Sequence, residues 1–301
     1  MTHQWHILGA GAIGSLFASS FARAGVPTIL LRRSGNLEAR VQDIRIDKNG
    51  VTQNLSFPIS ANNEAGPISH LLIATKAYDV RSALSEIAHR LDSSSNIFVL
   101  VNGMGYMEEI KADYPQLGFN SGATTEGVYR LQENHFCHAG DGLTRFGRAD
   151  QSRPPTCFNE WSRLDLPTVW EPNIEEFLWQ KMAVNCAINP MTAVHRCKNG
   201  ELAAAPDLAR QVNLLCDEIS QVSTAAGFAN TAANIHRWTA DVIVGTANNR
   251  SSMLQDILAG RQTENHYISG YLLKVAKRFK VTIPINTAIF EKVCKIDRGK
   301  D

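Results

Sequence analysis

A glycine-rich turn near the start of the chain limits the possible folds more than any other feature. Gly9-x-Gly11-x-x-Gly14 follows the short apolar run Trp5–Leu8 and opens a segment with helical periodicity. In that context the first glycine allows a tight turn, the second lets the backbone approach a pyrophosphate, and the third lets helix and strand pack closely. The helix N-terminus adds free N–H groups and a favourable dipole for phosphates. The predicted dinucleotide-binding turn comprises Gly9, Ala10, Gly11, Ala12, Ile13 and Gly14.

The first half of the chain alternates between apolar strands and amphipathic helices. Residues 28–31, 70–74 and 97–101 are strand-sized apolar runs, and a helical pattern covers residues 80–91. Continuously apolar strands that alternate with helices indicate a parallel sheet covered on both faces. Around Asn49-Gly50 polar and apolar residues alternate, which predicts a β-hairpin.

The second half has a different texture. Residues 128–146 alternate like antiparallel strands, and from residue 173 onward the pattern is helical. One apolar stripe repeats at helical spacing and predicts a long core helix; it consists of Leu208, Val212, Leu215, Ile219 and Val222. The sequence thus predicts an α/β Rossmann-type doubly wound parallel sheet over residues 1–172, followed by an all-α C-terminal domain over residues 173–301.

Composition narrows the class of protein. Thirty Lys plus Arg against 29 Asp plus Glu give a net charge of +1, whereas a protein that neutralises many phosphates usually has a basic excess, so we expect no nucleic-acid partner. The apolar runs are far shorter than the roughly 18 to 20 residues of a membrane span. The N-terminus lacks a secretory pattern. Six scattered cysteines without a C-x-x-C pair favour buried thiols in a reducing compartment, and we expect a cytoplasmic protein with no membrane partner.

One short stretch carries several metal-ligand side chains. Alternation along His135-Phe136-Cys137-His138 puts His135 and Cys137 on one face of a strand and His138 on the other. A second ligand pair does not follow at zinc spacing. We therefore expect no metal site here.

Two arginines at the end of the second strand indicate which dinucleotide binds. An Asp or Glu at this position would hydrogen-bond the ribose 2′-hydroxyl of NAD, but the chain has Arg32 and Arg33. Guanidinium groups pair with phosphate, which favours NADP(H). Lys76 ends the next buried strand at the same carboxyl edge of the sheet and adds a second cation. The alternative is a pair of solvated surface arginines.

A lysine and two asparagines share one helix face in the second half. Lys181, Asn185 and Asn189 are four residues apart, so they project from the same side of a helix. Such a row is either a hydrogen-bonded surface row or a site that offers a proton donor and two amides to a polar substrate. Hydride delivered to a ketone carbon creates an alkoxide, which an ammonium group can protonate. Burial would lower the pKa of the lysine towards the working range.

The whole chain resembles the ketopantoate reductase (2-dehydropantoate 2-reductase) family of NADPH enzymes, which act in pantothenate and coenzyme A biosynthesis. The motifs that match the family at similar spacing are Gly9-Ala-Gly-Ala-Ile-Gly14, Lys76 after its strand, Val101-Asn102-Gly103-Met104-Gly105, Gly122-Ala-Thr124-Thr125, Lys181-x-x-x-Asn185-x-x-x-Asn189-Pro190, Asn199-Gly200, Arg250-Ser251-Ser252-Met253-x-Gln255-Asp256 and Gly260-Arg261-x-Thr263-Glu264. They span residues 9 to 264.

The resemblance implies a role for each matching residue. Lys181 would protonate the new alkoxide as the general acid. The other substrate-binding residues would be Asn185, Asn189, Asn199, Asn249, Arg250, Ser251 and Ser252, with Ser252 on the carboxylate of the 2-oxo acid. Besides the glycine turn, the cofactor would contact Arg33, Lys76, Asn102, Val128 and Glu264. Asn102 would lie between nicotinamide and substrate, and Glu264 would contact the ribose and help to orient the lysine.

Two departures from the family and three alternative functions remain. The family often has His where this chain has Glu126, and Ile-Asp where it has Asn265-His266; both changes could alter substrate choice.

The alternative functions are a related 2-oxo acid reductase, an enzyme like 3-hydroxyacid dehydrogenases that prefers NAD, and a non-catalytic NADP-binding sensor. Arg33, Asn102 and Glu264 argue against the second. A sensor would not need the proton donor Lys181. The sequence leaves the oligomeric state open, with a homodimer as one arrangement.

Overall fold

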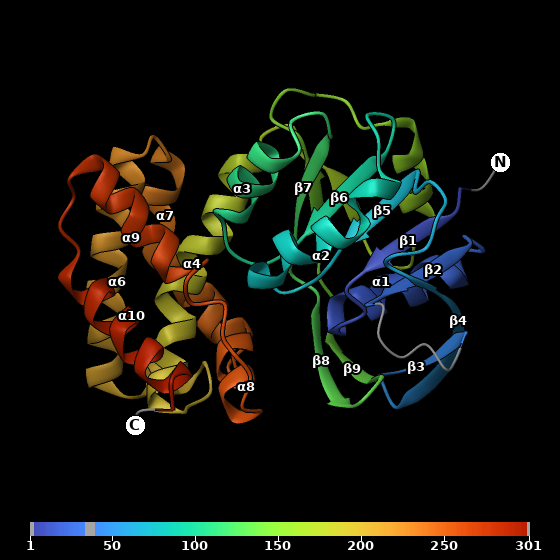
Figure 1. The fold of residues 1–301 in the computed structure, drawn as a ribbon. Helices are drawn as coiled ribbons and strands as arrows, with labels where there is room; N and C mark the ends of the chain where they lie inside the picture. Colours follow the sequence, from blue (N-terminus) through green and yellow to red (C-terminus); the bar gives the residue numbers. More distant parts are fainter. Residues whose placement is uncertain (1–2, 34–39, 300–301) are drawn as a thin grey trace. The chain divides into compact units, whose positions relative to one another are not determined.

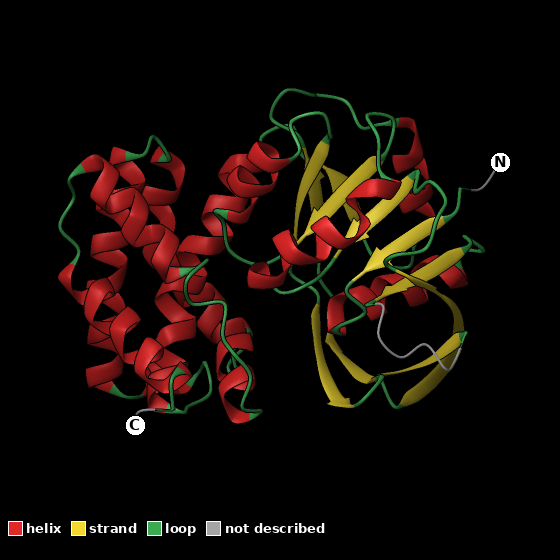
Figure 2. Cartoon of the chain, in the orientation of Figure 1, coloured by secondary structure: helices red, strands yellow, loops and turns green. Residues whose placement is uncertain are grey.

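The computed structural model describes residues 3–33 and 40–299, which divide into two compact units (Figure 1). The first, called the strand unit here, comprises Met1–Val101 and Tyr106–Ile174. The second, called the helical unit, comprises Asn102–Gly105 and Glu175–Asp301. Figure 2 shows that the strands belong to the first unit and that the second is built from helices. The four residues 102–105 thus belong with the helical unit, although a strand of the strand unit ends only two residues before them, at Leu100.

An eleven-stranded sheet forms the frame of the strand unit. Its spatial order is β11-β10-β7-β6-β5-β1-β2-β4-β3-β9-β8. The strands are β1 (Trp5–Leu8), β2 (Thr28–Arg32), β3 (Val41–Lys48), β4 (Val51–Ala61), β5 (His70–Ile73), β6 (Asn96–Leu100), β7 (Phe119–Thr124), β8 (Gly127–Gln132), β9 (His135–Gly140), β10 (Thr144–Gly147) and β11 (Thr168–Trp170). The helices are α1 (Ala12–Arg23), α2 (Val80–Ile87) and α3 (Tyr106–Asp113), with short 3-10 helices η1 (Ala77–Asp79), η2 (Ala88–Arg90) and η3 (Thr156–Arg163).

The centre of this sheet is parallel. β2, β1, β5, β6 and β7 pair in parallel, and every residue of β1 and β5 is buried, as continuous apolar runs require. The predicted Rossmann-type sheet followed by a helical domain is therefore confirmed. Antiparallel pairs extend the sheet on both sides, between β7 and β10, β3 and β4, and β8 and β9.

The predicted hairpin joins β3 and β4. Asn49 and Gly50 both have positive φ, at 51° and 78°, which is the conformation that a two-residue type I′ turn demands. This hairpin prediction is confirmed.

In the core of the strand unit, the fully buried Trp161 packs against the rings of Trp5, Phe98 and Phe146.

Seven helices make up the helical unit in the part of the chain that the structure describes. They are α4 (Ile174–His195), α5 (Glu201–Ala204), α6 (Pro206–Ala225), α7 (Ala229–Gly245), α8 (Ser252–Leu258), α9 (Ser269–Phe279) and α10 (Pro284–Asp297). The predicted stripe of α6 packs into the core, with four of its residues buried and Leu208 partly buried against them. Within the described residues, no helix combines the length and the hydrophobicity that crossing a bilayer needs.

The helix α4 is the centre of the helical unit. Its apolar side chains are buried on nearly all sides, including Met182, Ala183, Cys186 and Ala187. Polar side chains on such a buried helix are uncommon and indicate a structural or functional role.

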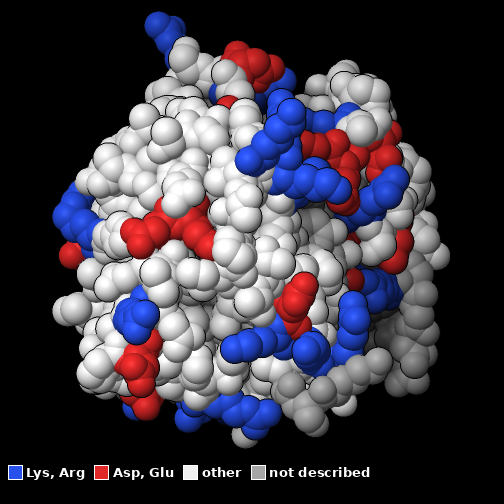
Figure 3. All heavy atoms as spheres, turned by 90° about the vertical axis from the view of Figure 1, so that its left-hand side faces the viewer, with Lys and Arg blue, Asp and Glu red and all other residues white. Residues whose placement is uncertain are grey.

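The molecular face in Figure 3 mixes Lys and Arg with Asp and Glu, in keeping with the net charge of +1.

Candidate active site

The glycine turn connects β1 to α1 with very little space. Gly9 has a φ of +99°, and a Cβ there would lie 2.7 Å from the backbone nitrogen of Thr75. A Cβ on Gly14 would lie 2.0 Å from the carbonyl oxygen of Gly9. At Gly11, by contrast, nothing lies within 4 Å of a Cβ. Two glycines therefore allow close packing, and the third leaves open backbone at the helix N-terminus, which fits a pyrophosphate.

The two arginines after β2 have different surroundings. The Arg32 guanidinium donates hydrogen bonds to Gln42 Oε1, and Gln42 in turn donates to Asn134 Oδ1 over 2.9 Å. The Arg33 side chain is 69% exposed, and its Nη2 lies 3.4 Å from Asp79 Oδ1. Arg32 is therefore part of the sheet, whereas Arg33 is the one available to a phosphate.

The other two predicted cofactor residues of the strand unit, Lys76 and Val128, lie on different parts of the sheet. Lys76 immediately precedes η1, after β5. Because the carboxyl ends of parallel strands meet at one edge of a sheet, Gly9, Arg33 and Lys76 share the edge where ligands bind in open α/β sheets. Val128 on β8 is partly buried against the core of the strand unit.

In the helical unit, Lys181 on α4 meets Asn102. Lys181 Nζ donates a hydrogen bond to Asn102 Oδ1 over 2.9 Å. Burial lowers the pKa of Lys181 from 10.5 to about 8, and the negative charge of Glu264 opposes part of that effect. An ammonium group with this pKa is protonated at neutral pH and releases its proton more readily than an exposed lysine.

The loop that carries Asn102 is fixed to a segment far along the chain. Met104 N–H donates a hydrogen bond to the carbonyl oxygen of Tyr267 over 2.8 Å. Gly103 has a φ of +80°, and a Cβ there would lie only 2.3 Å from the same oxygen. Gly103 is thus the residue that lets the loop approach Tyr267, and this contact holds Asn102 beside Lys181.

Glu264 precedes the same anchoring segment. It is 4% exposed, and its carbonyl oxygen accepts a hydrogen bond from Tyr267 N–H over 3.0 Å. The structure therefore brings together Lys181, Asn102 and Glu264, three residues to which the family resemblance gives roles in one site.

Of the predicted substrate asparagines, Asn249 is exposed and the other three are half-buried or buried. Asn185 is half-buried on α4, and Asn189 and Asn199 are each 6% exposed. Asn199 Nδ2 donates to Thr246 Oγ1 over 2.7 Å, while its Oδ1 is buried without a hydrogen-bond partner among the described residues. Asn199 N–H donates to the carbonyl oxygen of Asn249, which brings these two predicted residues into contact. A buried amide oxygen without a partner suits a polar ligand.

Two adjacent serines have different roles. Ser251 is the N-cap of α8, where its Oγ accepts a hydrogen bond from Leu254 N–H. It also lies 2.6 Å from Thr192 Oγ1 on α4, one turn beyond Asn189. Arg250 and Ser252 on either side are exposed. Ser251 therefore ties α8 to α4, and Ser252 is the hydroxyl available to a carboxylate.

Sequence reasoning missed three supporting residues. The Tyr267 carbonyl anchors the Asn102 loop, Thr192 holds Ser251, and Thr246 holds Asn199. A backbone carbonyl leaves no trace in residue identity, so Tyr267 could not be found. The two glycines that flank Met104 were the available signal that this loop makes a close approach.

Two sequence profiles match the chain. The profile described as "Ketopantoate reductase PanE/ApbA" covers residues 5–151, and the one described as "Ketopantoate reductase PanE/ApbA C terminal" covers residues 173–297. The chain is 32% identical to the 2-dehydropantoate 2-reductase of Vibrio cholerae, over 97% of both chains. It is 35% identical to that of Salmonella typhi, over 95% of this chain and 93% of the relative.

Solved structures with the same fold include three oxidoreductases. A PanE/ApbA family ketopantoate reductase from Ralstonia eutropha has a TM-score of 0.85 at 20% identity, and each chain is 99% covered. A D-mandelate dehydrogenase bound to NADH has the same TM-score at 19% identity and equal coverage. A dimeric ketopantoate reductase from Staphylococcus aureus has a TM-score of 0.83 at 18% identity, with 99% and 100% coverage. The profiles and relatives together show that the chain belongs to the ketopantoate reductase family of oxidoreductases.

Proposed function

We propose that the protein reduces 2-dehydropantoate (ketopantoate) to pantoate with NADPH, a step of pantothenate and coenzyme A biosynthesis. The observation that carries this proposal is the pair formed by Lys181 Nζ and Asn102 Oδ1, 2.9 Å apart, in the helical unit that also holds Glu264. A surface row of polar residues would not require a partly buried lysine with a pKa of about 8.

The two units have separate tasks in this proposal. The strand unit binds the cofactor through the glycine turn, Arg33, Lys76 and Val128. The helical unit binds the substrate and supplies the acid. When bound, the nicotinamide supplies a hydride for the ketone carbon. Asn102 orients Lys181. The negative charge of Glu264 stabilises the protonated form of Lys181, and Glu264 also contacts the ribose.

The residues on α4 and α8 position the substrate. Asn185, Asn189 and Asn199 hydrogen-bond its hydroxyl and carbonyl oxygens, and Ser252 binds its carboxylate beside Asn249 and Arg250. Lys181 Nζ donates its proton to the carbonyl oxygen as negative charge develops there. The neutral lysine then regains a proton from solvent.

Exchanging Arg33 for alanine tests the choice of NADPH. Loss of a charge-assisted hydrogen bond to the 2′-phosphate costs roughly 1.5 to 3 kcal/mol, about 10- to 150-fold in affinity. Arg33→Ala should therefore weaken NADPH binding by that factor and leave NADH binding nearly unchanged in a fluorescence titration. Arg81→Ala is the matched control, because Arg81 is also exposed but pairs with Asp113. Equal weakening of both cofactors would remove Arg33 from the phosphate site.

Removal of the Glu264 charge should shift the pH profile. Lys181 is protonated below its pKa of about 8, so kcat should fall as the pH rises through that value. Because the Glu264 carboxylate raises the pKa of Lys181, Glu264→Gln should move this alkaline limb to lower pH. The exposed Glu291 of the same unit provides the control Glu291→Gln. A limb that stays in place in Glu264→Gln would show that the two charges do not interact.

A panel of substrates tests the proposed reaction. NADPH consumption should be fastest with ketopantoate, slower with other branched 2-oxo acids, and slowest with an aromatic 2-oxo acid. Faster turnover of another oxo acid would identify a related reductase instead. NADPH binding without oxidation by any of these compounds would indicate a sensor.

A further inference from the structure

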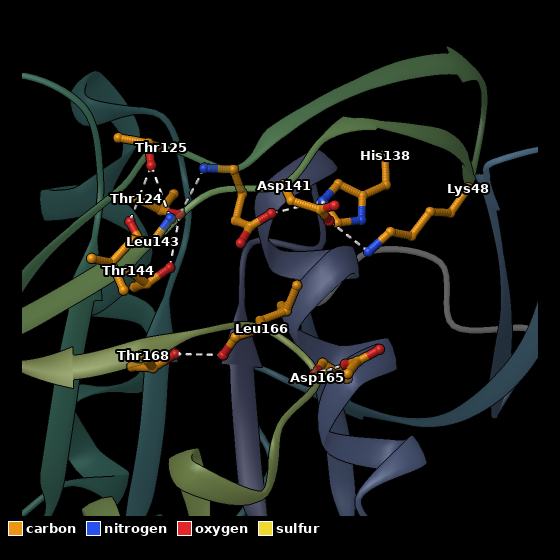
Figure 4. A network of polar contacts seen from close by, with 12 residues as sticks. Lys48, Thr124, Thr125, His138, Asp141, Leu143, Thr144, Asp165, Leu166 and Thr168 are labelled. Carbon is orange, nitrogen blue, oxygen red and sulfur yellow. Dashed lines mark hydrogen bonds and ion pairs between the residues drawn. The ribbon is translucent and has the colours of Figure 1, made fainter.

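A polar cluster in the strand unit lies outside the candidate active site. Figure 4 shows His138, Asp141 and Lys48 with their side chains converging. His138 Nε2 lies 2.7 Å from Glu126 Oε2 and 3.9 Å from Asp141 Oδ1. One ligand atom each from Glu126, His138 and Asp141 can be chosen so that all three lie within 4.8 Å of one another. We infer that Glu126, His138 and Asp141 bind one divalent transition-metal ion of the Zn²⁺ class.

The buried carboxylate of Glu126 is the main reason for this inference. The side chains of Glu126 and His138 are 0% and 2% exposed. Oε1 of Glu126 is buried and has no hydrogen-bond partner among the residues that the structure describes. A buried carboxyl oxygen without a partner is costly, because it has lost its hydrogen bonds to water and gained none in exchange. A cation bound by the Glu126 carboxylate would supply the missing partner.

Neighbouring threonines hold the two carboxylate-bearing segments together. Thr124 Oγ1 accepts a hydrogen bond from Glu126 N–H over 3.1 Å and lies 2.8 Å from Thr144 Oγ1. Thr125 Oγ1 accepts a hydrogen bond from Leu143 N–H over 2.9 Å (Figure 4). The chain segments before β8 and before β10 are therefore fixed to each other directly after Asp141.

Gly142 permits the close approach of these segments. A Cβ at Gly142 would lie 2.3 Å from the backbone nitrogen of Glu126. Glycine is thus required next to Asp141, and it places Asp141 beside Glu126. His138 comes from β9, where it pairs with Val128 of β8. The three ligands consequently converge from three short segments of one β-structure.

The donor set selects the class of ion. One imidazole nitrogen and two carboxylates suit Zn²⁺, with water in the fourth position, at ligand distances of about 2.0–2.2 Å. Mg²⁺ and Ca²⁺ prefer oxygen ligands alone. The ion would take the place of the proton that His138 Nε2 shares with Glu126. Asp141, whose side chain is 74% exposed, can move to complete the coordination.

The ammonium group of Lys48 would compete with the metal ion for the Asp141 carboxylate. Its Nζ lies 2.7 Å from Asp141 Oδ1, and its side chain is 37% exposed. The Lys48 ammonium group therefore pairs with the same carboxylate that the ion would bind. When the metal binds, Lys48 can turn into solvent.

The pattern along the chain did not reveal this site. Within His135-Phe136-Cys137-His138, His135 contacts Asp47 and lies on the other face of β9 from His138. The remaining ligands, Glu126 and Asp141, are 12 residues before and 3 residues after His138, outside any zinc spacing. Strand pairing rather than sequence spacing brings them together.

Zinc titration of the full-length, chelator-treated protein tests the inference. The wild type should bind one equivalent of Zn²⁺ per chain by calorimetry, and Co²⁺ should develop visible absorption bands at the same stoichiometry. Asp141→Asn should weaken Zn²⁺ binding by at least about tenfold. Loss of an outer-shell partner already costs about 10- to 100-fold in metal affinity, and Asp141 is proposed as a direct ligand. Asp150→Asn is the matched control, because Asp150 is similarly exposed and also pairs with a cation.

Two further variants sharpen the result. Lys48→Met should strengthen Zn²⁺ binding, because it removes the competing cation; no strengthening would contradict an ion beside Asp141. His138→Gln should abolish the Co²⁺ absorption, whereas His236→Gln, at an exposed histidine that also pairs with a carboxylate, should not. If His138→Gln does not fold, the exposed Asp141 still provides the test. Absence of saturable binding to the wild type, or identical zinc titrations of the wild type and Asp141→Asn, would overturn the inference.

Discussion

Replacing Lys181 with alanine is expected to lower kcat by about 10²- to 10⁴-fold, the usual contribution of a positioned general acid. The affinity for NADPH should stay nearly unchanged, because the glycine turn and Arg33 that are proposed to bind the cofactor belong to the other unit. Steady-state kinetics with ketopantoate and a separate NADPH titration measure the two quantities.

Lys277→Ala is the matched control for this result. Lys277 lies on α9 of the same unit and is exposed, so its loss removes the same charge without touching Asn102. Its kcat should equal that of the wild type. Near-normal kcat in Lys181→Ala would show that the acid lies elsewhere and that the row on α4 is structural.

Gly103→Ala should damage catalysis although Gly103 carries no chemical group. The new Cβ would lie 2.3 Å from the Tyr267 carbonyl oxygen, so the loop must move away and carry Asn102 with it. A displacement of about 1 Å in a positioning contact can cost on the order of 10²-fold in rate. We therefore expect kcat to fall by about one to two orders of magnitude, with a smaller change in the cofactor titration.

Gly227→Ala separates this effect from backbone strain. Gly227 in the same unit has a φ of +90°, but nothing lies within 4 Å of its Cβ position. Both substitutions therefore suffer the left-handed strain of about 1–2 kcal/mol, and only Gly103→Ala meets the carbonyl oxygen. The thermal midpoint should fall in both variants, whereas kcat should fall only in Gly103→Ala. Similar kcat values in the two variants would contradict the role of the Tyr267 anchor.

Local patterns predicted the parts of the fold that depend on neighbouring residues. The hairpin at Asn49-Gly50 follows from two residues that accept positive φ, and the packing of Gly9 and Gly14 follows from the lack of a Cβ. The parallel centre of the sheet follows from continuous apolar runs. The antiparallel extensions could be placed only roughly, because the partner of an edge strand is set by tertiary packing.

Site residues were predicted where chemistry and spacing agree. Helical spacing placed Lys181 and Asn189 on one face of α4, but it could not show that Asn102 joins them. That contact depends on an anchor between Met104 and Tyr267, residues far apart in sequence. The distinction between Arg32 and Arg33 likewise depends on Gln42, which binds Arg32 from the adjacent hairpin.

In the proposed mechanism, catalysis depends on the partly buried Lys181, which donates a proton to the substrate and has a pKa of about 8. The most direct measurement is the pH dependence of kcat for ketopantoate reduction with NADPH, in the wild type and in Lys181→Ala. The wild type should show an alkaline limb near pH 8, where Lys181 loses its proton, and this limb should be absent from the small residual rate of the variant. An alkaline limb of the same position and steepness in Lys181→Ala would contradict Lys181 as the proton donor.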